Sequence, residues 1–146
     1  MNFKKPKKMS VETLVMSGSA GREMLITWRE DRSLAGTCTV RVCRQTGHGS
    51  ISRVYVRPGF RRDGLGSALI RAAKGELRAA GSHRCFVLLH PHEQRTEVRA
   101  FFEFHHFEVI PGSEFDPPLG SLVMMCELDC GAICSGIENV KLEFSN

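Results

Sequence analysis

A short basic turn, Arg61 to Ser67 (RRDGLGS), carries the residue types that bind an anion. Its two glycines, Gly64 and Gly66, let backbone N–H groups point inward, and a helix that begins at Leu65 adds free donors and the positive end of its dipole. Such a corner binds a phosphate most readily. A Walker loop would need a lysine that this turn lacks, and a dinucleotide fingerprint would need Gly or Ala where Leu69 stands, so neither pattern fits.

The segments on either side of this turn are predicted to be a strand and a helix. Ile51 to Val56 is rich in β-branched and aromatic residues, and Pro58 and Gly59 end the run. From Leu65 to Ala80 the apolar residues recur at helical spacing, and Gly81 is placed to end the helix. The same spacing puts three basic residues on the opposite, polar face: Arg71, Lys74 and Arg78.

A second polar group follows the next apolar run. His90, His92 and Glu93 come directly after Cys85 to Leu89, which is continuously apolar and so predicts a strand buried on both faces. A strand, a helix and a second strand of this length form a right-handed crossover, so the two strands should be parallel. Polar residues at the end of such a strand face a ligand, and histidine suits proton transfer near neutral pH. The same residues also fit a polar turn that only caps the strand.

The remaining segments predict more strands and one short helix. Val11 to Met16 and Met24 to Arg29 read as a hairpin around the five-residue turn Ser17 to Gly21, and Leu34 to Cys43 alternates as a half-buried strand does. With the Ile51 strand they form an antiparallel meander. Further along, the pattern predicts a helix over Thr96 to His106 with Thr96 as N-cap, strands over Phe107 to Ile110 and Leu122 to Leu128, and an optional strand over Val140 to Phe144.

The pattern R-x-x-G-x-G, preceded by V-x-P, resembles the GNAT superfamily of acetyl-CoA-dependent N-acetyltransferases. Arg61, Gly64 and Gly66 stand at the three defining positions, and Val56 and Pro58 form the lead-in. The resemblance implies an α/β (α+β) fold: a mixed, mostly antiparallel sheet with a central parallel strand pair that splays apart, and flanking helices. It also implies that the turn wraps the pyrophosphate of coenzyme A while the preceding strand pairs with the pantetheine arm. The implied coenzyme contacts are Val54, Val56, Arg61, Arg62, Asp63, Gly64, Leu65, Gly66, Ser67, Arg95 and Phe102.

The resemblance runs from about Met24 to Leu128, and the segment RAFFEFHHFEVI looks like the family's RAFYEKHGFEVI type. Phe102 stands where many members carry a tyrosine that protonates the leaving thiolate. His106 replaces a frequent glycine, and Arg95 lies where an asparagine that contacts the coenzyme is common. The family's two helices between the first two strands are also missing. The acceptor site is therefore either unusually open or covered by a second subunit, and we expect a homodimer.

Acetyl transfer to an amine needs a donor for the developing oxyanion and a base for the ammonium group. The resemblance implies that a main-chain N–H near Tyr55 or Val56 polarises the thioester. The base is often a carboxylate on that strand, but Ser50, Ser52 and Arg53 offer none. His90, His92 and Glu93 are therefore the candidate catalytic groups, together with Tyr55.

Length and composition set the remaining limits. The chain has 146 residues, a length that predicts a single domain, which we place over 11–146. The net charge is +4, and part of it comes from the lysines near the N-terminus, where we expect a flexible basic arm over 1–10. No apolar run reaches the length of a membrane span, and the N-terminus has no secretory pattern, so we expect a cytoplasmic protein. The basic arm alone does not make nucleic acid an expected partner.

The six cysteines indicate free thiols rather than a disulfide framework. Cys126, Cys130 and Cys134 recur every four residues, a spacing that would group three thiols on a helix, but Cys126 falls in a predicted strand. We therefore expect no metal. The sequence predicts an N-acetyltransferase that moves an acetyl group from acetyl-CoA to a primary amine of a small molecule or peptide. The alternative is a catalytically weak acyl-CoA-binding or interaction module of the same fold.

Overall fold

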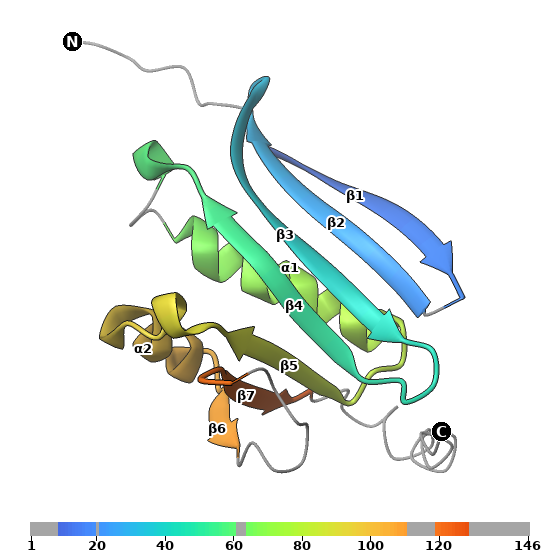
Figure 1. Cartoon of the computed structure of the whole chain (residues 1–146). Coiled ribbons are helices and arrows are strands. Elements are labelled where there is room, and N and C mark those ends of the chain that lie inside the picture. The colour runs from blue at the N-terminus through green and yellow to red at the C-terminus, as the bar shows by residue number, and fades with distance from the viewer. Residues whose placement is uncertain (1–8, 20, 61–63, 111–118, 129–146) are drawn as a thin grey trace, which may run out of the picture.

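The protein is built on one seven-stranded sheet in the order β1-β2-β3-β4-β5-β7-β6 (Figure 1). The structure is a computed structural model, and it describes residues 9–19, 21–60, 64–110 and 119–128. Of the arm predicted over residues 1–10, residues 1–8 lie outside these ranges, while Met9 and Ser10 belong to the first strand. The predictions for Arg61, Arg62 and Asp63, for Cys130 and Cys134, and for a strand over Val140 to Phe144 also lie outside the described residues.

The first four strands form the predicted antiparallel meander: β1 (Met9–Gly18), β2 (Gly21–Glu30), β3 (Ser33–Cys43) and β4 (Gly49–Val56). The first hairpin is tighter than predicted, because the β1–β2 ladder continues to the pair Gly18 and Gly21. Only residues 19 and 20 separate these strands, so no helix stands between the first two strands.

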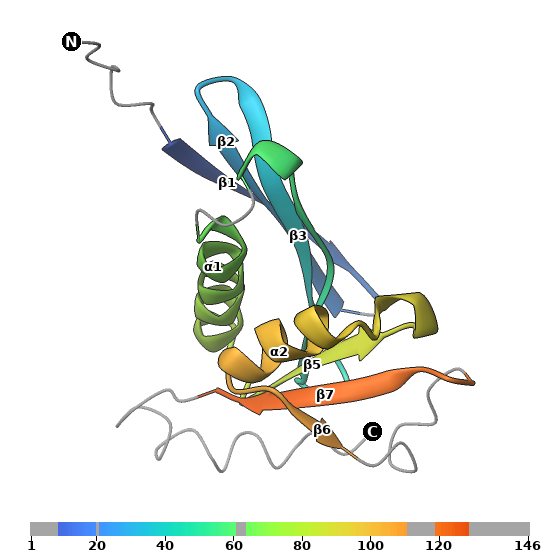
Figure 2. The same ribbon diagram turned by 90° about the vertical axis from the view of Figure 1, so that its left-hand side faces the viewer.

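A crossover through α1 (Leu65–Ala79) joins β4 to β5 (Arg84–Leu89), and the two strands are parallel, as predicted. They pair only at Gly49 with Cys85 and at Ser50 with Phe86, and then they diverge (Figure 1). The central splayed pair and the fold class are thus confirmed. Helix α1 lies against one face of the sheet (Figure 2) and ends as predicted, with Gly81 in the left-handed region at φ 86°.

The second half of the chain completes the sheet. A 3-10 turn, η2 (Pro91–Glu93), leads into α2 (Thr96–Phe104), and β7 (Leu122–Glu127) inserts between β5 and β6 (Glu108–Ile110). A second 3-10 turn, η1 (Pro58–Phe60), follows β4. The predicted N-cap of α2 was wrong by one residue: Arg95 is the N-cap, in extended conformation, and its carbonyl accepts the N–H groups of Val98 and Arg99.

The apolar stripe of α1 packs into the core, and its members Leu69, Ile70, Ala73 and Leu77 are fully buried. The prediction that Lys74 lies on the polar face was wrong, since the residue is only 7% exposed. Its ammonium donates a hydrogen bond to the carbonyl of His105 and lies 5.0 Å from the centre of the Phe107 ring. The segment that follows α2, which includes His105 and Phe107, covers this side of α1. The helical spacing of residues in the sequence does not show that another segment will cover this face.

Strand β5 differs from the prediction of a strand buried on both faces. Cys85, Val87 and Leu89 are buried, but Leu88 is 38% exposed and Phe86 is half-buried. The burial alternates along β5, so the face that carries Cys85, Val87 and Leu89 lies in the core, while the face that carries Phe86 and Leu88 is only partly covered. The apolar run from Cys85 to Leu89 therefore contributes to the wall of an open space between β4 and β5.

The described cysteines, Cys38, Cys43, Cys85 and Cys126, are free thiols, and Cys126 lies in strand β7, as predicted. Burial raises the pKa of Cys38 to about 12, and burial also raises the pKa of Cys85. Within residues 9–19, 21–60, 64–110 and 119–128 no three His, Cys, Asp or Glu side chains come together as a metal site would require. In the same ranges, no helix is both long and apolar enough to cross a membrane.

Candidate active site

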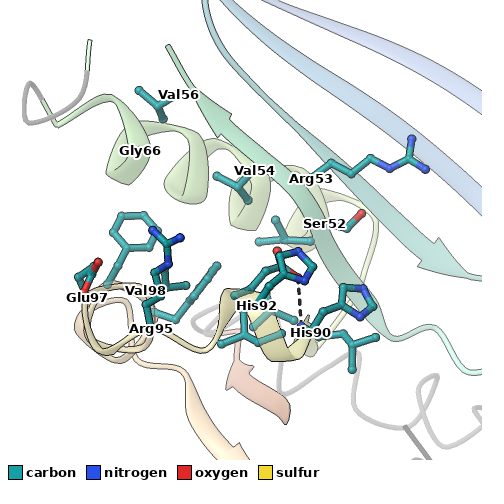
Figure 3. Close-up of a pocket in the computed structure, with 17 residues that line it drawn as sticks. Ser52, Arg53, Val54, Val56, Gly66, His90, His92, Arg95, Glu97 and Val98 are labelled. Atoms are coloured by element: carbon teal, nitrogen blue, oxygen red, sulfur yellow. Dashed lines mark hydrogen bonds between the residues drawn. The ribbon is translucent and has the colours of Figure 1, made fainter. Parts of the chain in front are cut away.

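A cavity of about 710 Å³ lies where β4 and β5 diverge (Figure 3). Its walls come from β4, β5, η2, α2 and the first turn of α1. Figure 3 shows Gly66 and Val56 at one end, and Ser52, His90 and His92 at the other. The structure thus brings together the glycine turn and the polar group after β5, which are more than twenty residues apart in the sequence.

The glycine turn reaches the cavity through the start of α1. Gly64 is the N-cap of α1, with φ 77° and no side-chain cap, a conformation that glycine adopts without strain. Gly66 lines the cavity, and a β-carbon there would lie 3.4 Å from the Phe101 ring and 3.7 Å from Val56. The first backbone N–H groups of a helix have no partner within it, so the turn offers hydrogen-bond donors at this end of the cavity.

Two other residues of the predicted turn point elsewhere. The Leu65 side chain is buried. The Ser67 hydroxyl is 2.9 Å from Nε2 of His105, so it ties α1 to the end of α2, and Ser67 is not part of the cavity wall. Any contact of these residues with a ligand would therefore come from the backbone at Leu65 and from a rearranged hydroxyl at Ser67.

Strand β4 forms one long wall of the cavity, with Val54 and Val56 facing it. The pairing between β3 and β4 shifts register between Thr37 and Thr39, and opposite this shift Arg53 adopts φ 51°. Such a bulge turns backbone groups out of the ladder. Tyr55 is exposed and is not among the residues that line the cavity. No glycine marks the bulge in the sequence, and sequence reasoning missed it.

The polar end of the cavity is the η2 turn. His90, His92 and Glu93 all line the cavity, and the two imidazole rings stack with 6.0 Å between centres and 4° between planes. The backbone N–H of His90 donates to Oε1 of Glu93 at 3.0 Å. Both readings of this segment are therefore present in the structure: Glu93 caps the turn, and the two histidines face the open space.

Helix α2 supplies the opposite wall. Arg95, Val98, Phe101 and Phe102 line the cavity, and the Phe102 ring stands edge-on to Phe101 and Phe107 with centres 5.3 and 5.4 Å away. This wall is apolar apart from its charged first turn, and Phe102 offers no proton. Glu97 also lines the cavity. Sequence reasoning missed Glu97, because an acidic residue in a first helical turn is ordinary.

His105 and His106 hold the end of α2 in place. Burial, followed by the nearby charges of Lys74, Arg71 and His106, lowers the pKa of His105, so its ring is neutral at pH 7. His106 has φ 70°, a left-handed conformation that glycine adopts more readily than other residues. His48 lies in the β3–β4 turn, edge-on to Phe86 at 5.2 Å and outside the cavity wall, and burial lowers its pKa as well.

The model of the acetyltransferase (GNAT) family matches residues 4–107. The chain belongs to this family. Among curated proteins, none matches the sequence. The fold of this GNAT domain is similar to that of several solved structures. Their sequences are less than 25% identical to this chain, so the likeness concerns the fold alone.

Three of these structures show the extent of the likeness. The PaiA N-acetyltransferase from Thermoplasma acidophilum, in complex with coenzyme A, is 17% identical with a TM-score of 0.60 over 72% of this chain and 60% of that one. An acetyltransferase from Streptococcus agalactiae is 18% identical with a TM-score of 0.62 over 73% and 67%. N-acetylglutamate synthase from Neisseria gonorrhoeae, complexed with coenzyme A and N-acetyl-glutamate, is 18% identical with a TM-score of 0.61 over 72% and 26%.

Proposed function

We propose that this GNAT-family protein transfers an acetyl group from acetyl-CoA to a primary amine of a small molecule or peptide. The observation that carries the proposal is the cavity between β4 and β5, which has the start of α1 at one end and two histidines at the other. Family membership supports acyl transfer, and two similar structures were solved with coenzyme A.

The coenzyme would lie along the cavity from the glycine turn toward η2. Backbone N–H groups at Gly64 and Gly66 are suited to a pyrophosphate, and the wall formed by Val54 and Val56 is suited to the pantetheine arm. The other predicted contacts are Arg61, Arg62, Asp63, Leu65, Ser67, Arg95 and Phe102. Of these, Arg95 and Phe102 line the cavity, which supports their assignment.

The reaction needs a base more than an acid. An alkyl amine with a pKa of about 10 must lose its proton before its nitrogen can bond to the acetyl carbon, whereas a thiol of pKa about 8.5 is a tolerable leaving group when the carbon–sulfur bond breaks. We assign the base to His90 or His92, since Glu93 already accepts the His90 N–H. A backbone N–H near Tyr55 or Val56, beside the β4 bulge, would stabilise the oxyanion.

The leaving thiolate would take its proton from water, because Phe102 has none to give. General acid groups contribute roughly 10² to 10⁴ in rate, so the missing tyrosine slows transfer within that range. We expect that Phe102→Tyr leaves activity similar or modestly higher. Replacing His90 or His92 by Ala should remove the ascending limb of the pH–rate profile, and profiles equal to the parent for both would point to Glu93 or a water chain.

The alternative function is a catalytically weak acyl-CoA-binding or interaction module, and Phe102 is the observation that favours it. An assay of thiol release from acetyl-CoA distinguishes the transferase from the binding module. The assay is run with and without candidate amines: aminoglycosides, polyamines, amino acids and peptides with a free N-terminus. Amine-dependent release supports the transferase. Acetyl-CoA binding without amine-dependent release supports the module, and no binding of acetyl-CoA contradicts both. The cytoplasmic location and the homodimer stay predictions of the sequence.

A further inference from the structure

The edge of the sheet at β1 is long and open. Strand β1 pairs with β2 along its whole length, from Met9 with Glu30 to Gly18 with Gly21, and in the described part of the chain no strand pairs with its other side. A ten-residue strand is about 33 Å long at 3.3 Å per residue. Its outer side presents backbone N–H and C=O groups in the geometry that another strand matches.

Within the residues that the structure describes, this edge has little of the usual protection against pairing. Sheet edges are normally short, or carry lysine, proline or a bulge. The β1 sequence MSVETLVMSG has no lysine, arginine or proline, and the β1–β2 ladder has no register shift. Its one charged residue, Glu12, has a carboxylate oxygen 3.9 Å from Nε of Arg29 on β2. The opposite edge, β6, spans three of the described residues, compared with ten in β1.

Apolar side chains lie exposed on both faces of β1. Val11, Leu14, Val15 and Met16 are 45% to 57% exposed. Because side chains alternate along a strand, Val11 and Val15 lie on one face while Leu14 and Met16 lie on the other. A covering helix would bury one of these faces only. A strand added at the edge contacts both faces and also pairs the backbone.

We propose that β1 pairs antiparallel with β1 of a second copy of this chain, around a two-fold axis near Thr13, so that one sheet runs through a dimer. The β1 sequence suits this pairing. With Thr13 at the axis, Val11 lies opposite Val15 of the second copy on one face, a favourable β-branched pair. On the other face Leu14 lies opposite Glu12 of the second copy. The two Glu12 side chains are then diagonal neighbours on this face, about 7–8 Å apart, rather than directly opposite each other.

Analytical ultracentrifugation of the full chain over a concentration series tests this proposal. The parent protein should sediment as a dimer at concentrations on the order of tens of micromolar. Leu14→Lys and Val15→Lys each place a charge near the axis in both copies, and should weaken dimerisation at least about tenfold. The matched control is Val109→Lys, which adds the same charge to the β6 edge at a residue that is 41% exposed, and should leave the dimer unchanged. Thermal unfolding checks that each variant is folded.

Cross-linking tests the register. In a Cys43→Ser background, Thr13→Cys should form a covalent dimer under mild oxidation, and Val109→Cys should not, with the other native cysteines common to both. A monomeric parent would overturn the proposal, whether another segment or another protein covers the edge. A dimer that survives Leu14→Lys and Val15→Lys would show that a different surface joins the copies.

Discussion

Replacement of the buried Lys74 by alanine or methionine measures what holds the end of α2 against α1. The lysine stem packs in the core, and its ammonium donates to the His105 carbonyl beside the Phe107 ring. The thiol of Cys126 is the other donor near that carbonyl, at 3.7 Å, and it is weak. Lys74→Met keeps most of the buried stem and removes the charge. Lys74→Ala removes both.

The two variants should differ in size of effect. A hydrogen bond from a charged group stabilises by about 1.5–3 kcal/mol, and a cation over an aromatic ring adds about 0.5–2 kcal/mol. Part of this is offset, because methionine also relieves the desolvation of a buried ammonium group. We expect Lys74→Met to lower the unfolding free energy by about 1–2 kcal/mol. Lys74→Ala should lower the unfolding free energy by about 3–4 kcal/mol, since it also removes roughly three buried methylene groups at about 0.8 kcal/mol each.

Urea denaturation followed by far-UV circular dichroism gives both values. Arg71→Ala on the exposed side of the same helix is the control, and it should stay within about 0.5 kcal/mol of the parent. If Lys74→Ala behaved like this control, Lys74 would be exposed, as the helical spacing predicts, and the packing of α2 described above would be wrong. If Lys74→Met and Lys74→Ala lowered the unfolding free energy equally, the buried stem of Lys74 would contribute nothing beyond its charge, and the reasoning would be wrong.

Three further predictions concern the glycine turn, the end of α2 and pH. Gly66→Asp should abolish acetyl-CoA binding in calorimetry, because its carboxylate would repel a pyrophosphate and its side chain would fill space at this end of the cavity; tight binding would contradict the site. His106→Gly should raise the unfolding free energy by about 1 kcal/mol by relieving the left-handed φ of 70°, and a lower urea midpoint would count against this. Since burial lowers the pKa of His48 and His105 below the ordinary 6.5, the unfolded chain binds protons first as the pH falls. Stability should therefore be full above about pH 6.5 and decline below it, and equal urea midpoints at pH 7.5 and 5.5 would refute the reasoning.

The local elements of this protein follow from its sequence. Alternation and β-branched runs identified the strands, and helical spacing with Gly81 at its end identified α1. The R-x-x-G-x-G turn between a strand and a helix indicated the family from a few neighbouring residues, and the family model confirms it. These signals are local because each depends on neighbours within a few residues, where backbone conformation and side-chain direction are set.

Four features were decided only by tertiary structure. Lys74 is buried because the end of α2 covers its side of α1, and Leu88 is exposed because its face of β5 is only partly covered. The bulge at Arg53 depends on pairing with β3, and its residue type gives no sign of it. The meeting of Gly66 with His90 and His92 around one cavity depends on how far the parallel strands stay paired. Each of these is a contact between segments distant in the sequence, and a periodic pattern reports which face of an element is apolar without reporting what will cover it.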